Sequence, residues 1–284
     1  MASFRERRIS MQDGLTVYCR DYGDPLGSRA PVFCLPGLTR NCRDFETLAS
    51  RLAATRRVVT PDLRGRGRSN HDPDWRNYRP ETYVRDVIAL LVALDLHPAV
   101  VIGTSLGGVL AMSLGAAAPT MLAGVVLNDV GPVIEVSGIA RIAGYVGIQQ
   151  RFPDWNAAIS GIQAGPAAEL GLSTAEAWDR FARQTFREVA DGVVLDYDMA
   201  LGKALRAAAG RPLPDLWALF GSLAHVPVLA LRGQRSDVLS AETFSAMAER
   251  RASLAQAVVP GVGHAPTLDE PTALEAIDAF LAGL

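Results

Sequence analysis

Short apolar runs, rich in β-branched residues and ended by turn-forming residues, recur along the chain. Runs without alternation of apolar and polar positions are typical of strands that are buried on both faces of a parallel sheet. The predicted strands are Leu15–Arg20, Pro31–Leu35, Arg57–Thr60, Ala99–Ile102, Leu122–Leu127, Val226–Leu231 and Ala255–Val259.

Stretches with helical periodicity lie between these runs. Pro80 begins one predicted helix, and Ser105–Ala118 and Pro271–Leu281 are predicted as two more. Alternating strands and helices imply right-handed crossovers and a sheet that is covered on both faces. The predicted fold class is therefore α/β, with a mostly parallel, doubly wound sheet.

The alternation stops between about Pro132 and Leu223, where we find helix-like segments and no convincing strand. The expected helical pieces are Asp154–Ala158, Ser173–Val189, Asp196–Ala208 and Asp215–Leu223. This pattern predicts a helical cap at 132–223, inserted into a core formed by 1–131 and 224–284. Most aromatic residues of the insertion are expected to form its own small core, and a few to line a pocket against the sheet.

Composition narrows the class of protein. The chain has 284 residues, of which 49% are hydrophobic and 20% charged, so it can bury a large core. A net charge of −2 argues against nucleic acid as the main partner. No apolar stretch is long enough to span a membrane, and the first residues lack the apolar region of a secretory signal. We therefore expect a cytoplasmic protein, of unknown oligomeric state.

The cysteines are Cys19, Cys34 and Cys42. Their number is odd, and their spacing matches no common zinc motif, so we expect neither a disulfide framework nor a structural metal site.

The sharpest chemical signal is the sequence Gly103-Thr104-Ser105-Leu106-Gly107, which follows a predicted strand and begins a predicted helix. It matches the G-x-S-x-G nucleophile elbow. Such a turn strains the serine backbone, needs small residues at both glycine positions, and points the amides of the helix N-terminus toward the reacting atom. Ser105 is therefore the candidate nucleophile.

A serine hydroxyl needs a base, and the chain offers four histidines. His97 and His225 precede predicted strands, so they are expected at the opposite end of the sheet from Ser105, whereas position alone does not exclude His71. His264 follows the last predicted strand, in a glycine-containing loop that reaches the carboxyl edge of the sheet. We therefore predict His264 as the base.

The base in turn needs a carboxylate to orient it. Asp237 follows the strand Val226–Leu231, and Asp129 follows the strand Leu122–Leu127, so both are expected at the carboxyl edge. Asp237 is preferred, because the order Ser105, Asp237, His264 matches the order known for nucleophile-elbow hydrolases. Asp129 remains the competitor, with a turn or an anchor for the insertion as its other expected role.

With these pieces placed, the chain resembles the α/β-hydrolase superfamily, in its group of serine hydrolases with a helical cap. Outside the elbow and the loops of Asp237 and His264, two motifs carry this resemblance: Leu35-Pro36-Gly37-Leu38 and Asp62-Leu63-Arg64-Gly65-Arg66-Gly67-Arg68-Ser69. It implies an α/β-hydrolase fold with the cap inserted after the sixth strand, and a reaction that needs no cofactor or metal. It also implies an oxyanion hole formed by the backbone amides of Leu38 and Leu106, although the usual family pattern there begins with His-Gly rather than Pro36-Gly37.

The segment from Arg40 to Arg85 holds eleven Arg against six Asp or Glu. It could form an anionic substrate site, or its charges could pair internally, as the Asp62–Ser69 motif does in similar proteins. We favour internal pairing, because Arg often makes bidentate structural ion pairs.

The predicted function is hydrolysis of a carboxylic ester of a small to medium, mainly apolar substrate through an acyl-enzyme on Ser105. Serine at the elbow argues against epoxide hydrolases and haloalkane dehalogenases, which resemble this chain but use aspartate there. Carbon–carbon hydrolysis of ring-fission products ranks second, since a tryptophan often follows the catalytic histidine of those enzymes and Ala265 stands here. A cofactor-free perhydrolase would use the same residues, and a non-catalytic small-molecule binder is the least favoured alternative.

Overall fold

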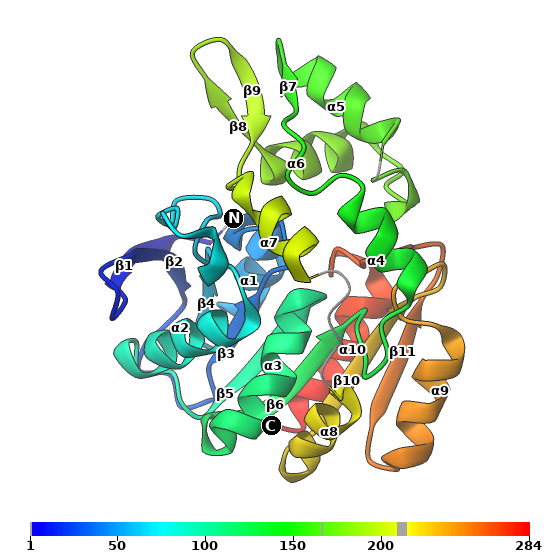
Figure 1. Cartoon of the computed structure of the whole chain (residues 1–284). Coiled ribbons are helices and arrows are strands. Elements are labelled where there is room, and N and C mark those ends of the chain that lie inside the picture. Colours follow the sequence, from blue (N-terminus) through cyan, green and yellow to red (C-terminus); the bar gives the residue numbers. More distant parts are fainter. Residues whose placement is uncertain (1, 166, 209–214) are drawn as a thin grey trace.

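The computed structural model describes residues 2–165, 167–208 and 215–284, and its centre is an eight-stranded sheet in the order β1-β2-β4-β3-β5-β6-β10-β11 (Figure 1). The strands are β1 Phe4–Ser10, β2 Thr16–Tyr22, β3 Val32–Leu35, β4 Val58–Pro61, β5 Ala99–Thr104, β6 Leu122–Asn128, β10 Val228–Gly233 and β11 Ala255–Val259. The pairs β1–β2 and β2–β4 are antiparallel, and the other neighbours are parallel.

Each strand predicted from an apolar run is present, which confirms the mostly parallel sheet. The additional strand, β1, was missed because its sequence Phe-Arg-Glu-Arg-Arg-Ile-Ser is mostly charged. β1 lies at the edge of the sheet and pairs only with β2. An edge strand keeps much of its surface in water, so pairing rather than burial holds this segment extended.

Helices cover both faces of the sheet (Figure 1). One apolar core contains residues of α2 (Pro80–Ala93), α3 (Leu106–Ala117), α8 (Leu216–Gly221) and α9 (Ala241–Arg250), and the other contains residues of α1 (Glu46–Leu52) and α10 (Pro271–Ala282). Short 3-10 helices complete the connections: η1 Cys42–Phe45, η2 Trp75–Asn77, η3 Pro119–Met121, η4 Ala168–Leu170 and η5 Ser222–His225. The doubly wound α/β fold is thus confirmed. Within the described ranges, no helix combines the length and the apolar character that crossing a bilayer requires.

The part of the segment between β6 and β10 that precedes α8 lies above the carboxyl edge of the sheet in Figure 1, whereas α8 lies at the lower end of the molecule in this view. Its elements before α8 are α4 (Val136–Ala143), α5 (Trp155–Gln163), α6 (Ala175–Thr185) and α7 (Ala200–Ala208), with β7 (Arg151–Phe152), β8 (Phe186–Val189) and β9 (Gly192–Leu195). The three strands form an antiparallel sheet in the order β7-β9-β8. Residues 166 and 209–214 of the predicted cap lie outside the described residues.

The expectation that this insertion lacks strands is therefore wrong. Phe186–Val189 was placed at the end of a helix, yet that helix stops at Thr185 and the chain continues as β8. The missed signal is Asp191-Gly192 followed by Val193 and Val194, a turn sequence next to β-branched residues that is typical of a hairpin.

The aromatic residues of the insertion divide between two cores. Phe186 is fully buried in the insertion's own small core, where its ring meets Phe152 edge-on at 5.5 Å between centroids. Phe220 of α8 instead belongs to the apolar core that α3 shares with the main sheet. Tyr145, Phe181, Phe186 and Tyr197 also line a cavity against the sheet, which is the pocket that the sequence led us to expect.

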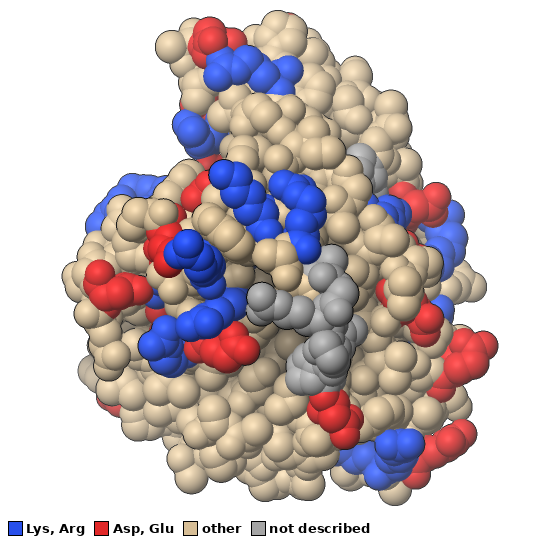
Figure 2. Space-filling view, viewed as in Figure 1, with Lys and Arg blue, Asp and Glu red and all other residues tan. Residues whose placement is uncertain are grey.

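The arginine-rich segment pairs its charges largely within the protein. Arg64 is buried and contacts carboxylate oxygens of Asp13, Asp72 and Asp86 at 2.6–2.7 Å. On the face shown in Figure 2, basic and acidic side chains lie beside one another at several places. The arginine-rich segment also contacts the insertion through its backbone, since the Gly67 amide donates to the Asp196 carbonyl at 3.0 Å. Arg64 is therefore paired within the protein, which is the interpretation favoured from the sequence.

Candidate active site

Ser105 lies between the end of β5 and the start of α3, at the carboxyl edge of the sheet. Its backbone has φ 53° and ψ −115°, a conformation that non-glycine residues rarely adopt. The Ser105 amide donates to the Asn128 carbonyl at 3.0 Å, which ties this turn to the end of the neighbouring strand β6. The strained elbow expected from the motif is therefore present.

Two glycines leave the space that this turn needs. A β-carbon added at Gly107 would lie 2.1 Å from the Leu35 carbonyl oxygen, and one at Gly103 would lie 2.4 Å from the Gly107 carbonyl carbon. Both neighbours are backbone atoms, which cannot rotate away as a side chain can. β5 and α3 can therefore pack this closely only with glycine at both positions.

Gly107→Ala is expected to lower the free energy of unfolding by about 3 kcal/mol or more, because overpacking against backbone strains the whole elbow. Thermal and urea unfolding measure the change. Gly221→Ala is the matched control, since a β-carbon there meets nothing within 4 Å, and alanine favours a helix over glycine. Equal stability of the two variants would contradict the prediction.

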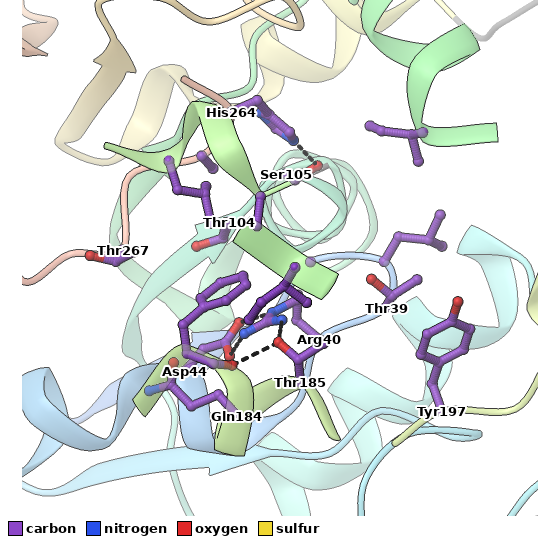
Figure 3. Close-up of a pocket in the computed structure, with 18 of the residues that line it drawn as sticks. Thr39, Arg40, Asp44, Thr104, Ser105, Gln184, Thr185, Tyr197, His264 and Thr267 are labelled. Atoms are coloured by element: carbon purple, nitrogen blue, oxygen red, sulfur yellow. Dashed lines mark hydrogen bonds and ion pairs between the residues drawn. The ribbon is translucent and has the colours of Figure 1, made fainter. Parts of the chain in front are cut away.

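His264 follows β11 and faces the nucleophile (Figure 3). Its Nε2 lies 3.0 Å from Ser105 Oγ, within hydrogen-bond distance, and its side chain is 9% exposed. With Nε2 as acceptor, the serine hydroxyl donates to the imidazole, which is the arrangement that a general base requires. The structure thus brings together two of the three predicted catalytic side chains.

Asp129 holds the other side of the imidazole. Its Oδ2 lies 2.7 Å from His264 Nδ1, and its side chain is fully buried. The Gly233 amide donates to Oδ1 at 2.7 Å, and the Ser236 hydroxyl donates to Oδ2 at 2.6 Å. These donors fix the carboxylate, which in turn accepts the Nδ1 proton and leaves Nε2 free to accept from Ser105.

The expectation that Asp237 contacts His264 is wrong. Asp237 instead accepts from Arg141 of α4, with its Oδ2 2.5 Å from Nε and its Oδ1 2.8 Å from Nη2. These hydrogen bonds lower the pKa of the Asp237 carboxyl, so this ion pair stays charged at neutral pH. The carboxylate beside the imidazole is the competitor, Asp129.

The order of the strands explains this difference. β6 is the direct neighbour of β5, so Asp129, the first residue after β6, emerges beside Ser105. Asp237 comes four residues after the end of β10, one strand further away, in a loop that turns toward α4. Both aspartates follow a strand and lie at the carboxyl edge, as expected from the sequence. Only Asp129, which directly follows the strand next to β5, contacts the histidine.

The loop after β3 runs alongside the nucleophile. A β-carbon added at Gly37 would lie 3.8 Å from Ser105 Cβ, which is van der Waals contact. Leu38 follows, and its carbonyl accepts from Nε of the fully buried Arg66 at 2.8 Å, which fixes the loop. Leu106 is the first residue of α3, so its amide is among those that a helix leaves unpaired. An oxyanion hole at Leu38 and Leu106 is compatible with this geometry and stays a prediction.

A cavity of about 190 Å³ lies over Ser105 and His264, between the sheet edge and the insertion. This volume is below the ~300–1,000 Å³ of pockets for drug-sized ligands, so it suits a small substrate. Its apolar lining includes Leu38, Ile142, Ile162, Leu170, Phe181, Phe186, Leu195 and Leu268, and its polar lining includes Thr39, Arg40, Asp44, Arg141, Gln150, Gln184 and Thr185. These polar residues were not singled out from the sequence as part of a pocket.

Comparison with known proteins identifies the family. Residues 32–277 match the model of the alpha/beta hydrolase family. The chain belongs to this family. It is 36% identical over 271 residues to a 3-hydroxybutyrate-oligomer hydrolase of Cupriavidus necator, covering 93% of this chain and 92% of that one. It is 28% identical over 239 residues to a 2-(acetamidomethylene)succinate hydrolase of Mesorhizobium japonicum, covering 84% and 82% of the two chains.

A solved structure supports the same assignment. The crystal structure of an alpha/beta hydrolase from Novosphingobium aromaticivorans has a TM-score of 0.94 and 43% sequence identity to this chain, with both chains covered completely. The protein is thus a hydrolase of this fold.

In this α/β hydrolase, Arg40 links the loop after β3 to the insertion. Its Nε and Nη2 donate to Asp44, its Nη1 donates to Thr185 Oγ1 at 2.5 Å, and its guanidinium lies 4.4 Å from the Phe181 ring centroid. Figure 3 shows this group below Ser105 and His264, at another side of the pocket. No sequence signal singled out Arg40, because its partners in the insertion lie far along the chain.

The remaining histidines lie away from this site. His225 contacts the carbonyl oxygens of Ser222 and Pro119 at 2.9 and 3.0 Å. His71 is exposed and lies 3.7 Å from an oxygen of Asp198. Neither these two residues nor His97 lines the cavity, so His264 is the histidine that the structure offers to Ser105.

Proposed function

We propose that this hydrolase cleaves carboxylic esters of small, mainly apolar substrates through an acyl-enzyme on Ser105. The observation that carries the proposal is the continuous chain from Ser105 Oγ to His264, 3.0 Å, and from His264 to buried Asp129, 2.7 Å. A buried carboxylate, an imidazole and a hydroxyl in this order form the arrangement that activates serine for acyl transfer.

The proposed reaction begins when Ser105 Oγ attacks the ester carbonyl carbon while His264 Nε2 takes the hydroxyl proton. Asp129 stabilises the imidazolium that forms. The developing oxyanion accepts from the amides of Leu38 and Leu106, where each such donor typically supplies about 3–4 kcal/mol of barrier lowering. His264 then gives the proton to the leaving alcohol oxygen. A water molecule, deprotonated by His264, attacks the acyl-enzyme and releases the acid and free Ser105.

We further propose short oligoesters of small hydroxy acids as the substrate class. The relative from Cupriavidus necator, whose name specifies hydrolysis of 3-hydroxybutyrate oligomers, aligns with 93% of this chain. The small cavity with a largely apolar wall fits a repeat unit that carries a short alkyl group. In this proposal, residues 132–223 act as the cap that closes the cavity over the ester.

The test combines a substrate series with active-site labelling. We expect the protein to hydrolyse the dimer and trimer of 3-hydroxybutyrate, and a fluorophosphonate probe to phosphonylate Ser105 stoichiometrically, as located by peptide mass spectrometry. A dienoic ring-fission substrate, run beside p-nitrophenyl esters of increasing acyl length, examines carbon–carbon cleavage. A thousandfold preference for the dienoic substrate would replace ester hydrolysis as the function, and folded protein that resists labelling would indicate a non-catalytic binder.

A further inference from the structure

The cavity is lined by two arginines, and their hydrogen bonding differs. Arg40 uses all three guanidinium nitrogens on protein partners, Asp44 and Thr185, while its face covers the Phe181 ring. Arg40 and Asp44 thus neutralise one another inside the lining. Three of the five N–H groups of Arg40 are used, one on each nitrogen, so Arg40 offers a ligand no nitrogen that is free of a protein partner.

Arg141 is bonded along one edge only. Its Nε and Nη2 donate to the two carboxylate oxygens of Asp237, at 2.5 and 2.8 Å. Across the part of the chain that the structure describes, Nη1 makes no hydrogen bond of normal distance and angle, although the Tyr145 hydroxyl, in the same cavity lining, also interacts with the guanidinium. The side chain is 32% exposed and lines the same cavity as Ser105. The guanidinium therefore presents its other edge, Nη1 with the second N–H of Nη2, to a ligand or to solvent.

Asp237 fixes the direction of this edge. The chain around Asp237 packs on α4, since a β-carbon at Gly138 would lie 2.5 Å from the Asp237 carbonyl oxygen, and the Glu135 amide donates to the Val238 carbonyl at 3.0 Å. The Asp237 carboxylate is itself about one-third exposed, so water also solvates it. A planar guanidinium that is held along one edge loses less rotational freedom when it binds a second acceptor on the other edge.

We propose that the second edge of Arg141 binds the free carboxylate of the substrate. A carboxylate matches two parallel N–H groups in a plane, which makes it the acceptor that arginine holds best. In an oligomer of hydroxy acids, this group is the terminal carboxylate, so the enzyme favours oligoesters with a free acid end over capped ones. The inference rests on the proposed ester hydrolysis at Ser105, and it adds that the preferred substrate carries a negatively charged carboxylate.

The local charges permit this binding. The positive charge of Arg40 compensates the negative charge of Asp44. Asp237 binds one edge of the Arg141 guanidinium, and the ligand would bind the opposite edge. One guanidinium can serve two carboxylates in this way because its two edges point in different directions. Arg64 of this same protein shows such sharing, with Asp86 on its Nε and Nη2 and two further aspartates on its Nη1.

The test measures binding without turnover. In the Ser105→Ala protein, calorimetry compares the 3-hydroxybutyrate dimer with a free carboxylate and the same dimer capped as its methylamide. We expect the free acid to bind about 10- to 100-fold more tightly, the range typical of hydrogen bonds to a charged group. Arg141→Gln, added to Ser105→Ala, is expected to remove this preference and to change the affinity for the methylamide less than about threefold.

Two controls separate recognition from structural pairing. Asp237→Asn removes the negative charge but keeps an amide oxygen that can still accept from Arg141 Nε, so Arg141 stays oriented and the preference for the free acid is expected to persist. Arg151→Gln makes the same substitution in an exposed ion pair with Asp191, at a residue that does not line the cavity, and should also keep it. If Asp237→Asn abolishes the preference as Arg141→Gln does, Arg141 acts only through the ion pair and the proposal is overturned.

The same measurements distinguish this inference from the proposed function. Equal binding of the acid and the methylamide to the Ser105→Ala protein overturns the role of Arg141, whatever the activity of the unmodified enzyme. Preference for the acid without hydrolysis of either dimer by the unmodified enzyme keeps the role of Arg141 and overturns ester hydrolysis.

Discussion

Ser105→Ala is expected to lower kcat for the 3-hydroxybutyrate dimer by about 10⁵-fold, because the acyl-enzyme cannot form without the hydroxyl. Serine hydrolases that lose their nucleophile retain only the small rate enhancement due to binding and oxyanion stabilisation. The backbone at position 105 is already strained in the unmodified protein, and alanine removes one oxygen without adding volume. We therefore expect the variant to fold normally and to lose labelling by a fluorophosphonate.

Ser113→Ala is the matched control for this experiment. Ser113 lies on the same helix, α3, and its hydroxyl donates to the Val109 carbonyl at 2.8 Å, outside the cavity lining. Its loss should leave kcat within about twofold, since exposed or locally bonded hydroxyls contribute little. A rate for Ser105→Ala within tenfold of the unmodified enzyme, after active contaminants are excluded by titration, would rule out Ser105 as the nucleophile.

The sequence predicted the central sheet because burial leaves a strong local signal there. Residues Val100–Ile102 of β5, for example, are fully buried, so the chain carries an uninterrupted apolar run there that a search for periodicity detects. β1 and the β7-β9-β8 sheet lack an uninterrupted apolar run, because these strands are short or partly exposed and are held mainly by pairing, β1 with β2 and β8 with β9 as hairpins and β7 with the more distant β9. Pairing partners cannot be inferred from a run of charged or mixed residues.

In the candidate site, too, the residues within a local sequence pattern could be predicted, and the residue whose position depends on the three-dimensional fold could not. Ser105 and His264 could be located because each stands in a local pattern, an elbow or a loop after the last strand. The choice between Asp129 and Asp237 depended on the spatial order of β5, β6 and β10, and on Arg141 of α4, which binds Asp237. These are three-dimensional facts, so a single sequence left both aspartates possible and the order of residues along the chain favoured the wrong one.

The two aspartates therefore have different environments, which predict different effects when each is neutralised. Asp129 is fully buried and accepts from Gly233, Ser236 and His264, whereas Asp237 is about one-third exposed and bound to Arg141. We expect Asp129→Asn to lower kcat by about 10⁴-fold, the cost known for the equivalent change in a serine protease. Asp237→Asn is expected to lower kcat less than about threefold.

The reason lies in the proton on the imidazole. An asparagine amide at position 129 would donate to His264 Nδ1, and the imidazole would then carry its proton on Nε2, 3.0 Å from Ser105 Oγ. In that tautomer Nε2 cannot accept the serine proton, although shape and packing are almost unchanged. The measurement is kcat on the dimer for both variants, with thermal unfolding to show that each is folded. A loss of activity in Asp237→Asn as large as that in Asp129→Asn would show that contact with the imidazole does not decide which carboxylate serves the reaction.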